Sequence, residues 1–233
     1  MLHTAVRNND IDQVRVLLRD GADANAHDTY DQSPLYHAAS IKIAMLLLEH
    51  GANIHARNYL GDTPLHIAVI NGNIEIVMFL LEHVADVDAR TSESWTPLHT
   101  AAETDNIEAA KLLLEQGASV YARTNYGCTP LHIAAYNSNA GAIMLLMEHG
   151  ASFHTRTYDG LTPLHIAARN GHIETAKLLA AYAIQAAWRA YRRSRAARVI
   201  QSYWVRAYWD PDYRVCQARL HRDFAALAAE AAH

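Results

Sequence analysis

Hydrophobic residues recur at helical spacing in several short stretches of the chain. Two clear examples are IEIVMFLLEH at 74–83 and IEAAKLLLEQ at 107–116, in which apolar residues return every three or four positions. Most of these stretches are followed by glycine, a residue that ends a helix in a left-handed turn. The pattern predicts a series of short amphipathic helices.

A second set of short helices is predicted from the positions of proline. Pro64, Pro97, Pro130 and Pro163 are 33 residues apart, and Pro34 precedes Pro64 by 30. Each follows Thr or Ser, which caps a helix N-terminus, and proline itself suits the first helical turn. The chain therefore repeats a pair of helices. Because one pair is too small to bury its own apolar face, the copies are expected to stack.

The repeat, with segments such as TPLHIAA at 129–135 and a closing Gly-Ala, resembles the ankyrin repeat. The resemblance covers residues 1–183, about six modules. It implies an all-α solenoid of helix-turn-helix modules with short β-hairpin fingers, which binds partners on a concave side. Beyond this ankyrin-repeat domain we expect a basic helix at 184–209 and a short Ala-rich helix at 210–233.

Three modules depart from the repeat. The module at 28–57 is three residues shorter than the others, and we expect the loss to fall in the loop between its helices. Val84 stands where glycine closes other modules. A branched residue in a left-handed turn is strained by about 1 kcal/mol or more, so we expect that turn to be reshaped. Ala183 takes the same place in the last module, whose second helix is expected to run on.

Composition points to a folded chain of a reducing compartment. Apolar residues make up 51% and charged residues 19%, which excludes wholesale disorder. Cys128 and Cys216 offer neither a disulfide framework nor a metal knuckle, so we expect the cytoplasm, with the nucleus as the alternative. No signal peptide is recognisable, and no apolar run approaches the ~20 residues of a transmembrane segment.

The histidines of the repeat do not predict a metal site. His66, His99, His132 and His165 occupy one repeat position, at which the ankyrin histidine hydrogen-bonds the neighbouring turn. Since they are spread one per module, they do not converge on one ion. The chain has no HExxH, paired CxxC, GxSxG or phosphate-loop motif. We therefore expect no enzyme, no cofactor and no small-molecule substrate.

Two repeat positions are expected to face the concave groove and to contact a protein client. They are the residue two before each proline and the residue just after the double-alanine position. Aromatic side chains at such exposed positions are typical of binding hot spots. For Trp95 the alternative is packing against the next finger. The predicted partner-binding residues are Ile70, Trp95, Glu103, Cys128, Tyr136, Leu161 and Arg169, with Tyr126 and Tyr158 at the fingertips.

The C-terminal part of the chain has a charge opposite to that of the repeats. Residues 184–233 contain nine Arg, no Lys and four acidic residues, whereas residues 1–183 contain 20 acidic and 11 basic residues. A basic amphipathic helix is typical of a calmodulin target or a membrane-surface element.

This basic segment also resembles an IQ motif, the calmodulin-binding pattern, and ankyrin repeats joined to IQ segments give a layout similar to inversin-like proteins. Ile184, Gln185 and Arg189 match the motif, and a second, weaker copy begins at Ile200 and Gln201. The resemblance implies that Ile184 and Trp188 enter an apolar groove of calmodulin while Arg189 and Arg193 meet its acidic rim.

Two other interpretations of the basic helix stay open. It caps the last repeat, or it binds an anionic surface such as nucleic acid or lipid, the least favoured of the three. The sequence thus predicts a protein-interaction scaffold that also binds calmodulin or a calmodulin-like protein. The alternative is a plain ankyrin adaptor whose C-terminal helix only caps the stack.

Overall fold

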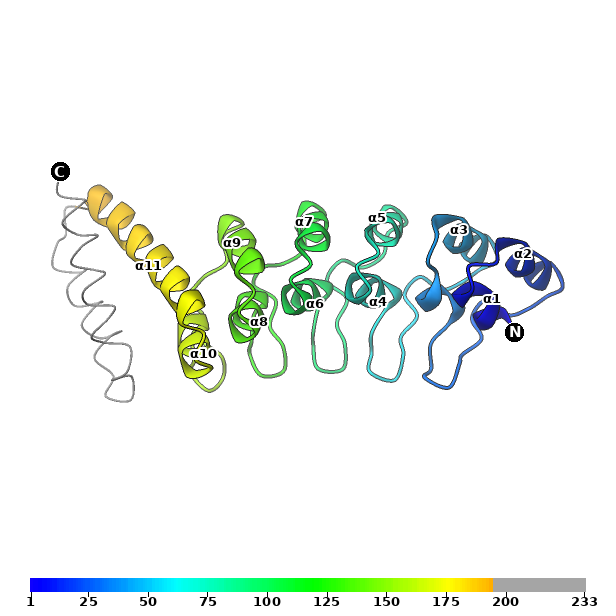
Figure 1. Ribbon diagram of the computed structural model, residues 1–233, viewed down its shortest axis with the longest axis horizontal. Coiled ribbons are helices and arrows are strands. Elements are labelled where there is room, and N and C mark those ends of the chain that lie inside the picture. The colour runs from blue at the N-terminus through cyan, green and yellow to red at the C-terminus, as the bar shows by residue number, and fades with distance from the viewer. Residues whose placement is uncertain (195–233) are drawn as a thin grey trace. The chain divides into compact units, whose positions relative to one another are not determined.

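The computed structural model describes residues 1–194, without the side chains of residues 187 and 189–194. The chain divides into two compact units, Met1–Pro163 and Leu164–His233. In the first unit, helix pairs follow one another in a row, and the loops that we call fingers project from one side of the row (Figure 1). The helices of this unit are α1 (Leu2–Arg7), α2 (Ile11–Arg19), the 3-10 helix η1 (Pro34–His37), α3 (Ile41–Glu49), α4 (Pro64–Ile70), α5 (Ile74–Glu82), α6 (Pro97–Thr104), α7 (Ile107–Glu115), α8 (Pro130–Asn137) and α9 (Ala140–Glu148).

Each module after the first consists of an inner helix that starts at proline and an outer helix that starts after a polar cap. The inner helices η1, α4, α6 and α8 lie next to the fingers, and the outer helices α3, α5, α7 and α9 lie behind them (Figure 1). Asn73 and Asn106 cap α5 and α7 by accepting a hydrogen bond from the backbone three residues on. The predicted stack of helix pairs is confirmed.

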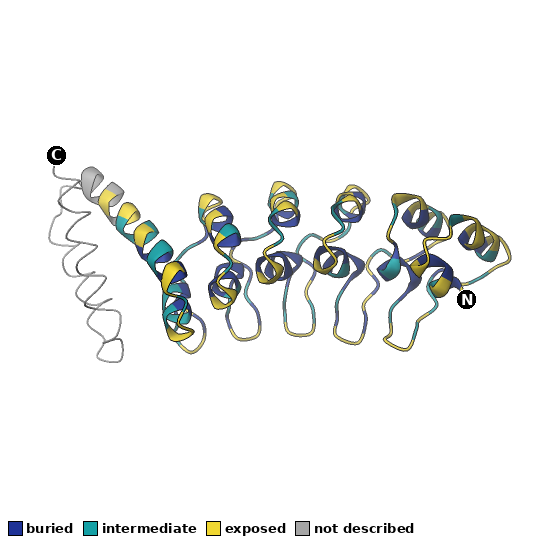
Figure 2. Ribbon diagram, viewed as in Figure 1, coloured by how far each residue is buried: buried dark blue, intermediate teal, exposed yellow. Residues whose placement is uncertain are grey.

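The core of the first unit runs between the two rows of helices, where the buried segments of successive modules face one another (Figure 2). Leucines at two repeat positions form its centre, and alanines at the neighbouring positions let the helices approach closely. Burying one such leucine side chain contributes about 2 kcal/mol. The fully buried leucines at these positions are Leu35, Leu65, Leu98 and Leu131 on the inner helices, and Leu47, Leu80, Leu113 and Leu146 on the outer helices.

Side-chain hydrogen bonds join each module to the next. The Nδ2 of Asn106, which caps α7, donates to the carbonyl oxygen of Val69 at the end of α4, at 3.2 Å. Asn73 and Asn139 make the corresponding bonds to the preceding inner segments. Because this side chain accepts a hydrogen bond for the helix cap and donates one across the module junction, asparagine suits the position better than aspartate, which has no donor when ionised.

The fingers are tight loops. In each one the backbone N–H of the first residue donates to the carbonyl oxygen of the fifth, as from Thr91 to Trp95 at 2.9 Å and from Thr124 to Cys128 at 2.9 Å. The ankyrin resemblance implies β-hairpins, but no strand forms within residues 1–194, because the backbone hydrogen bonds inside each finger stay within its five residues and do not extend into a ladder.

The short module at 28–57 differs from the expectation. Its loop keeps Ser40 as the N-cap residue of α3, and the missing residues are taken from the inner helix, which shrinks to the four-residue 3-10 helix η1. The prediction that the loop alone would be clipped is wrong. Residues 38–40 still link the two helices, so the shortening falls on the inner helix instead.

Val84 does not reshape its turn. It adopts φ +67°, close to the left-handed φ of +87° at Gly117 in the next module. The hydrogen bonds from Val84 to Leu81 and from Ala85 to Leu80 are those that Gly117 and the residue after it make. The prediction of a changed turn is therefore wrong. Val84 adopts the left-handed conformation that glycine has in the other modules, and this conformation is strained for a branched residue.

The second unit contains α10 (Pro163–Arg169, whose first residue belongs to the first unit) and α11 (Ile173–Ser194). Helix α11 continues past Ala183 without a break, as expected from the missing glycine. Predictions for residues 195–233, including Ile200, Gln201 and the short helix at 210–233, lie outside the described residues. Within the described part, no helix has the length and apolar character to cross a bilayer.

Candidate functional site

The row of residues two before each proline is held by the repeated histidines. Each histidine accepts a hydrogen bond at Nδ1 from the backbone N–H of the Thr that precedes proline, so its Nε2 carries the proton and donates to the next finger. The acceptors are the main-chain carbonyl oxygens of this row. The three bonds run from His66 to Trp95 (3.3 Å), from His99 to Cys128 (3.1 Å) and from His132 to Leu161 (3.2 Å).

Burial suits these histidines to this role and to no other. It lowers the pKa of His66, and lowers the pKa of His99 and of His132 to about 4. The imidazoles are therefore neutral at physiological pH, as the bond to Nδ1 requires. Within the described residues no cluster of His, Cys, Asp and Glu side chains is arranged to hold a metal ion.

The side chains of this row are only partly accessible. Trp95, Cys128 and Leu161 are all half-buried. The ring of Trp95 lies 5.9 Å from the ring of His99, centroid to centroid. Burial raises the pKa of the Cys128 thiol, so this cysteine is not activated as a nucleophile. The row forms the floor of the candidate surface.

The second row, at the C-terminal ends of the inner helices, is exposed. It contains Ile70 of α4, Glu103 of α6 and Tyr136 of α8. Burial of part of its side chain raises the pKa of Glu103, and no cation offsets this effect. These three side chains present apolar, acidic and aromatic groups along successive modules.

The fingertips add the most exposed aromatic side chains of the surface. Tyr126 is 64% exposed and Tyr158 is 71% exposed, and the backbone N–H of Tyr158 donates to the carbonyl oxygen of Tyr126 at 3.1 Å. The guanidinium of Arg123 lies 5.2 Å from the centroid of the Tyr158 ring. Two neighbouring fingers are thus fixed side by side with their tyrosines directed outward. We call Ile70, Trp95, Glu103, Tyr126, Cys128, Tyr136, Tyr158 and Leu161 the finger–helix surface.

A family comparison decides what kind of repeat this is. A model of the family described as ankyrin repeats (3 copies) matches residues 1–58, 55–124 and 119–187. The chain belongs to the ankyrin-repeat family. Ankyrin repeats are in general non-catalytic modules of protein–protein interaction, and membership of the family implies this kind of role for the matched region.

Individual relatives share single stretches of the ankyrin region. The chain is 46% identical over 70 residues to the 2-5A-dependent ribonuclease of Mus musculus, covering 28% of the chain and 10% of that protein. It is 44% identical over 71 residues to the B-cell lymphoma 3 protein homolog of Mus musculus, and this match covers 29% of the chain and 16% of that protein. It is 38% identical over 84 residues to the transient receptor potential cation channel subfamily V member 5 of Rattus norvegicus. That match covers 29% of the chain and 12% of the channel subunit.

These likenesses are local, because the chain spans between 10% and 16% of the length of the three relatives. The match to the ribonuclease covers only its ankyrin region, so it carries no information about catalysis in this chain.

Three exposed fingertip residues of the ankyrin stack are absent from the partner-binding residues predicted from the sequence. Tyr30, Tyr59 and Leu60 lie on the first two fingers and are all exposed. They occupy the same finger positions as Tyr126 and Tyr158, so an alignment of the five finger segments shows them without a structure. The aromatic character of the fingertips therefore extends over most of the stack.

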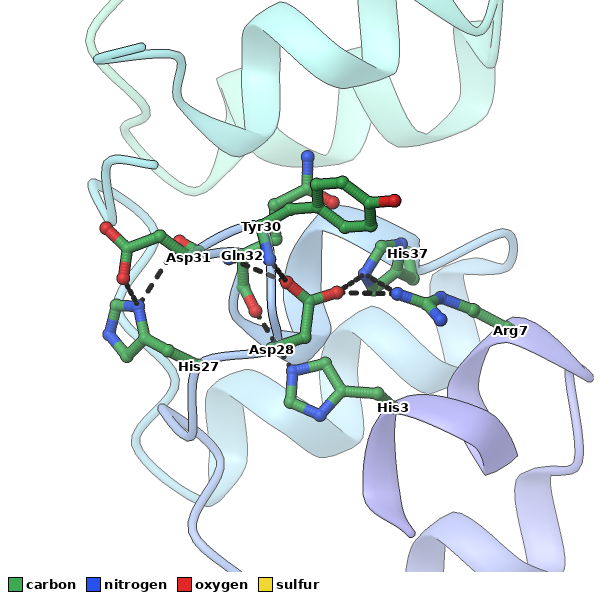
Figure 3. A network of polar contacts seen from close by, with 8 residues as sticks. All are labelled: His3, Arg7, His27, Asp28, Tyr30, Asp31, Gln32 and His37. Atoms are coloured by element: carbon green, nitrogen blue, oxygen red, sulfur yellow. Dashed lines mark hydrogen bonds and ion pairs between the residues drawn. The ribbon is translucent and has the colours of Figure 1, made fainter. Parts of the chain in front are cut away.

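The first finger is fixed by a polar network (Figure 3). Asp28 accepts hydrogen bonds from the backbone N–H groups of Tyr30 and Gln32, and pairs with Arg7 at 2.5 Å and with His37 at 3.1 Å. Burial acts to raise the pKa of Asp28, but the backbone donors and His37 outweigh it and lower the pKa to about 2. The network joins α1 to the finger and to η1, and its role is structural.

The remaining predicted residues lie in the second unit. Arg169 is exposed at the end of α10. On α11, Ile184 is half-buried, Gln185 is exposed and Trp188 is 45% exposed. The same helix contains Arg189 and Arg193, whose side chains lie outside the description.

Proposed function

We propose that the chain binds a protein client through the finger–helix surface. The proposal depends on three exposed tyrosines: Tyr126 on the finger at 124–128, Tyr136 on α8, and Tyr158 on the finger at 157–161. Large aromatic side chains are costly to leave in water and are enriched in the energetic centres of protein interfaces. None of the three contributes its ring to the core of the stack.

The surface is also pre-organised. Its backbone is fixed by the histidine bonds to Trp95, Cys128 and Leu161 and by the bond between the fingers of Tyr126 and Tyr158. A surface that is ordered before binding loses little conformational entropy when a client arrives. The half-buried floor and the exposed rim of this surface resemble the anatomy of a protein interface.

Exchange of two exposed tyrosines tests this proposal. The double variant Tyr126→Ala with Tyr136→Ala is expected to reduce client binding in a quantitative pull-down by about tenfold or more, since two hot-spot residues contribute at least 1 kcal/mol each. Thermal unfolding is expected to change little, because both side chains are mainly exposed. Client capture that equals that of the unchanged chain contradicts the proposal.

The matched control lies on the outer helices. Met78 of α5 and Met144 of α9 are 44% and 43% exposed, so they are large apolar side chains of comparable accessibility on the opposite row of helices. Met78→Ala with Met144→Ala is expected to leave capture unchanged. If this control loses the client and the tyrosine variant keeps it, the client binds the outer helices.

We further propose that α11 binds calmodulin or a calmodulin-like protein through its IQ-like segment. The observation that favours it is the continuous helix through Ile184, Gln185 and Trp188, with the last two exposed. The alternative, a helix that only caps the repeats, predicts no binding in either calcium state.

Titration calorimetry with purified calmodulin, with and without calcium, separates these two. Ile184→Glu is expected to abolish binding, whereas Ile173→Glu, the same exchange in the first turn of the same helix, is expected to leave it intact. If the unchanged chain does not bind calmodulin either with or without calcium, the calmodulin proposal is wrong and α11 only caps the repeats. The cytoplasm or the nucleus is part of this proposal, because a calmodulin-like partner and a free cysteine such as Cys128 both suit a reducing compartment.

A further inference from the structure

The fingers contain acidic side chains and no basic ones. The five finger segments read DTYDQ at 28–32, NYLGD at 58–62, TSESW at 91–95, TNYGC at 124–128 and TYDGL at 157–161. They hold five carboxylates and not one Lys, Arg or His. Asp28 and Asp31 of the first finger pair with Arg7, His37 and His27, so the unpaired carboxylates accompany the exposed tyrosines on the later fingers.

The arginines beside the fingers are already engaged. Arg57, Arg90 and Arg123 each donate to the main-chain carbonyl oxygen of the arginine one module later, with distances of 2.9 Å from Arg90 and 2.5 Å from Arg123. Arg156 donates to the carbonyl oxygen of Gly160 at 2.6 Å. These guanidinium groups bind the bases of successive fingers together, and their hydrogen bonds go to carbonyl oxygens and not to the carboxylates of the tips.

Three carboxylates on the finger–helix surface or on its fingers have no partner within residues 1–194. They belong to Glu93 and Asp159 on the fingers and to Glu103 on α6, and no hydrogen bond or ion pair of the described residues engages them. Glu103 is partly desolvated, which raises its pKa. A cation placed against it offsets that cost, since an opposite charge favours the ionised form.

Tyrosines stand on the modules between and beside these carboxylates: Tyr126 and Tyr136 belong to the module after that of Glu93 and Glu103, and Tyr158 is next to Asp159. Tyr126, Tyr136 and Tyr158 expose their rings between Glu93 and Asp159 in chain order. Aromatic faces attract Lys and Arg through the ring quadrupole, and carboxylates pair with the same side chains. Both groups select for positive charge.

We propose that the client segment bound by the finger–helix surface is an extended, Arg- or Lys-rich peptide. This inference rests on the proposed function and names the chemistry of its partner. Packed helices lie about 8–10 Å apart, and three residues of an extended chain cover about 10 Å. A cation at every third residue therefore matches the spacing of successive modules.

Fluorescence anisotropy with the full chain tests this inference. The probe is a labelled peptide of about ten residues with arginine at every third position and Gly or Ser elsewhere, and the control peptide has glutamine in place of arginine. The arginine peptide is expected to bind at least about tenfold more tightly than the glutamine peptide, and binding is expected to weaken with salt. Equal binding of the two peptides, or no binding of either, overturns the inference.

A pair of matched variants locates the binding site. Glu93→Gln, Glu103→Gln and Asp159→Asn together are expected to weaken binding of the arginine peptide by about tenfold. Glu82→Gln, Glu115→Gln and Glu148→Gln together change the net charge equally, but these residues lie at the ends of the outer helices. This second variant is expected to stay within about twofold of the unchanged chain. Equal weakening in both variants means non-specific attraction and contradicts the inference.

The two proposals fail in different ways. If the tyrosine variant of the pull-down loses its client while the arginine peptide does not bind, the surface binds protein but the cationic segment is wrong. If the arginine peptide binds and depends on Glu93, Glu103 and Asp159, the inference is supported by a measurement that does not need the client.

Discussion

The imidazole of His99 donates a hydrogen bond from Nε2 to the carbonyl oxygen of Cys128 at 3.1 Å, across 29 residues of sequence. The other ring nitrogen accepts from the backbone N–H of Thr96 at 3.1 Å. One neutral ring thus caps its own helix and fixes the next finger. The same arrangement at His66 and His132 makes the position of each finger depend on the module before it.

These histidines make stability depend on pH. The pKa of His99 and of His132 is lowered from 6.5 to about 4 in the folded chain. Between these values the unfolded chain binds protons that the folded chain excludes, so stability is complete above pH 6.5 and is lost as the pH falls toward 4. Each residue accounts for a loss of about 3 kcal/mol over this window.

Urea unfolding at pH 7 and at pH 5 measures this effect. The double variant His99→Gln with His132→Gln is expected to be less stable at pH 7 but to lose much less stability than the unchanged chain on acidification. His50→Gln, an exchange at an exposed position, serves as the control. An equal pH dependence in the unchanged chain and in the double variant contradicts the assignment.

Asn106 is expected to stabilise the chain in two separable ways. Asn106→Ala removes both the cap of α7 and the bond to Val69, and is expected to lower the free energy of unfolding by about 1–2 kcal/mol. Asn106→Asp keeps a capping oxygen and loses only the inter-module donor, so a smaller loss is expected. Urea unfolding of the two variants checks this order. A loss at Asn106→Asp as large as that at Asn106→Ala contradicts a separate contribution of the cap, and no loss at Asn106→Asp means that the bond to Val69 contributes nothing.

Val84 is expected to be a site at which glycine stabilises. Its φ of +67° is strained for a branched residue, and its side chain is exposed, so little packing is lost. Val84→Gly is expected to raise the free energy of unfolding by about 0.5–1 kcal/mol, after allowance for the more flexible unfolded chain. Thermal unfolding measures the change.

Val16 provides the opposite control for the same exchange. It is an exposed valine inside α2, where glycine is unfavourable. Val16→Gly is expected to lower stability by about 0.5–1 kcal/mol. The account of Val84 is wrong if both exchanges destabilise.

The charge network of the first finger predicts a second, more acidic transition. Asp28 has its pKa lowered to about 2 from 3.8, so its contribution of about 2 kcal/mol is complete above pH 3.8 and is lost as the pH falls toward 2. Asp28→Asn is expected to cost about this amount at pH 7. Asp12→Asn, which alters an exposed pair, is expected to change stability by less than about 0.5 kcal/mol.

The sequence predicts the helix pairs well because their signals are local and repeated. Thr-Pro starts each inner helix, and the histidine three residues later has a bonding pattern that the repeat imposes. Periodicity cannot show what the shortening at 28–57 removes, since a loop residue and a helical turn are equally compatible with the missing length. In the structure residues 38–40 form the loop and the inner helix is the shorter element.

The sequence predicts which repeat positions form the candidate surface, but it does not predict how far each side chain is exposed to solvent. Trp95, Cys128 and Leu161 are half-buried, which depends on the modules on either side of them. Tyr136 and the fingertip tyrosines are exposed because their rings lie outside the core of the stack. The sequence of a single repeat does not give the exposure of these side chains, since the exposure depends on how neighbouring repeats stack.

The central claim is that a protein client binds the finger–helix surface, and site-specific photo-crosslinking tests it most directly. A benzoylphenylalanine is placed at Tyr136 on α8 in one sample and at Met78 on α5 in another, and each chain is irradiated with its bound client. The account predicts a client adduct from position 136 and none from position 78. An adduct from position 78 alone contradicts it.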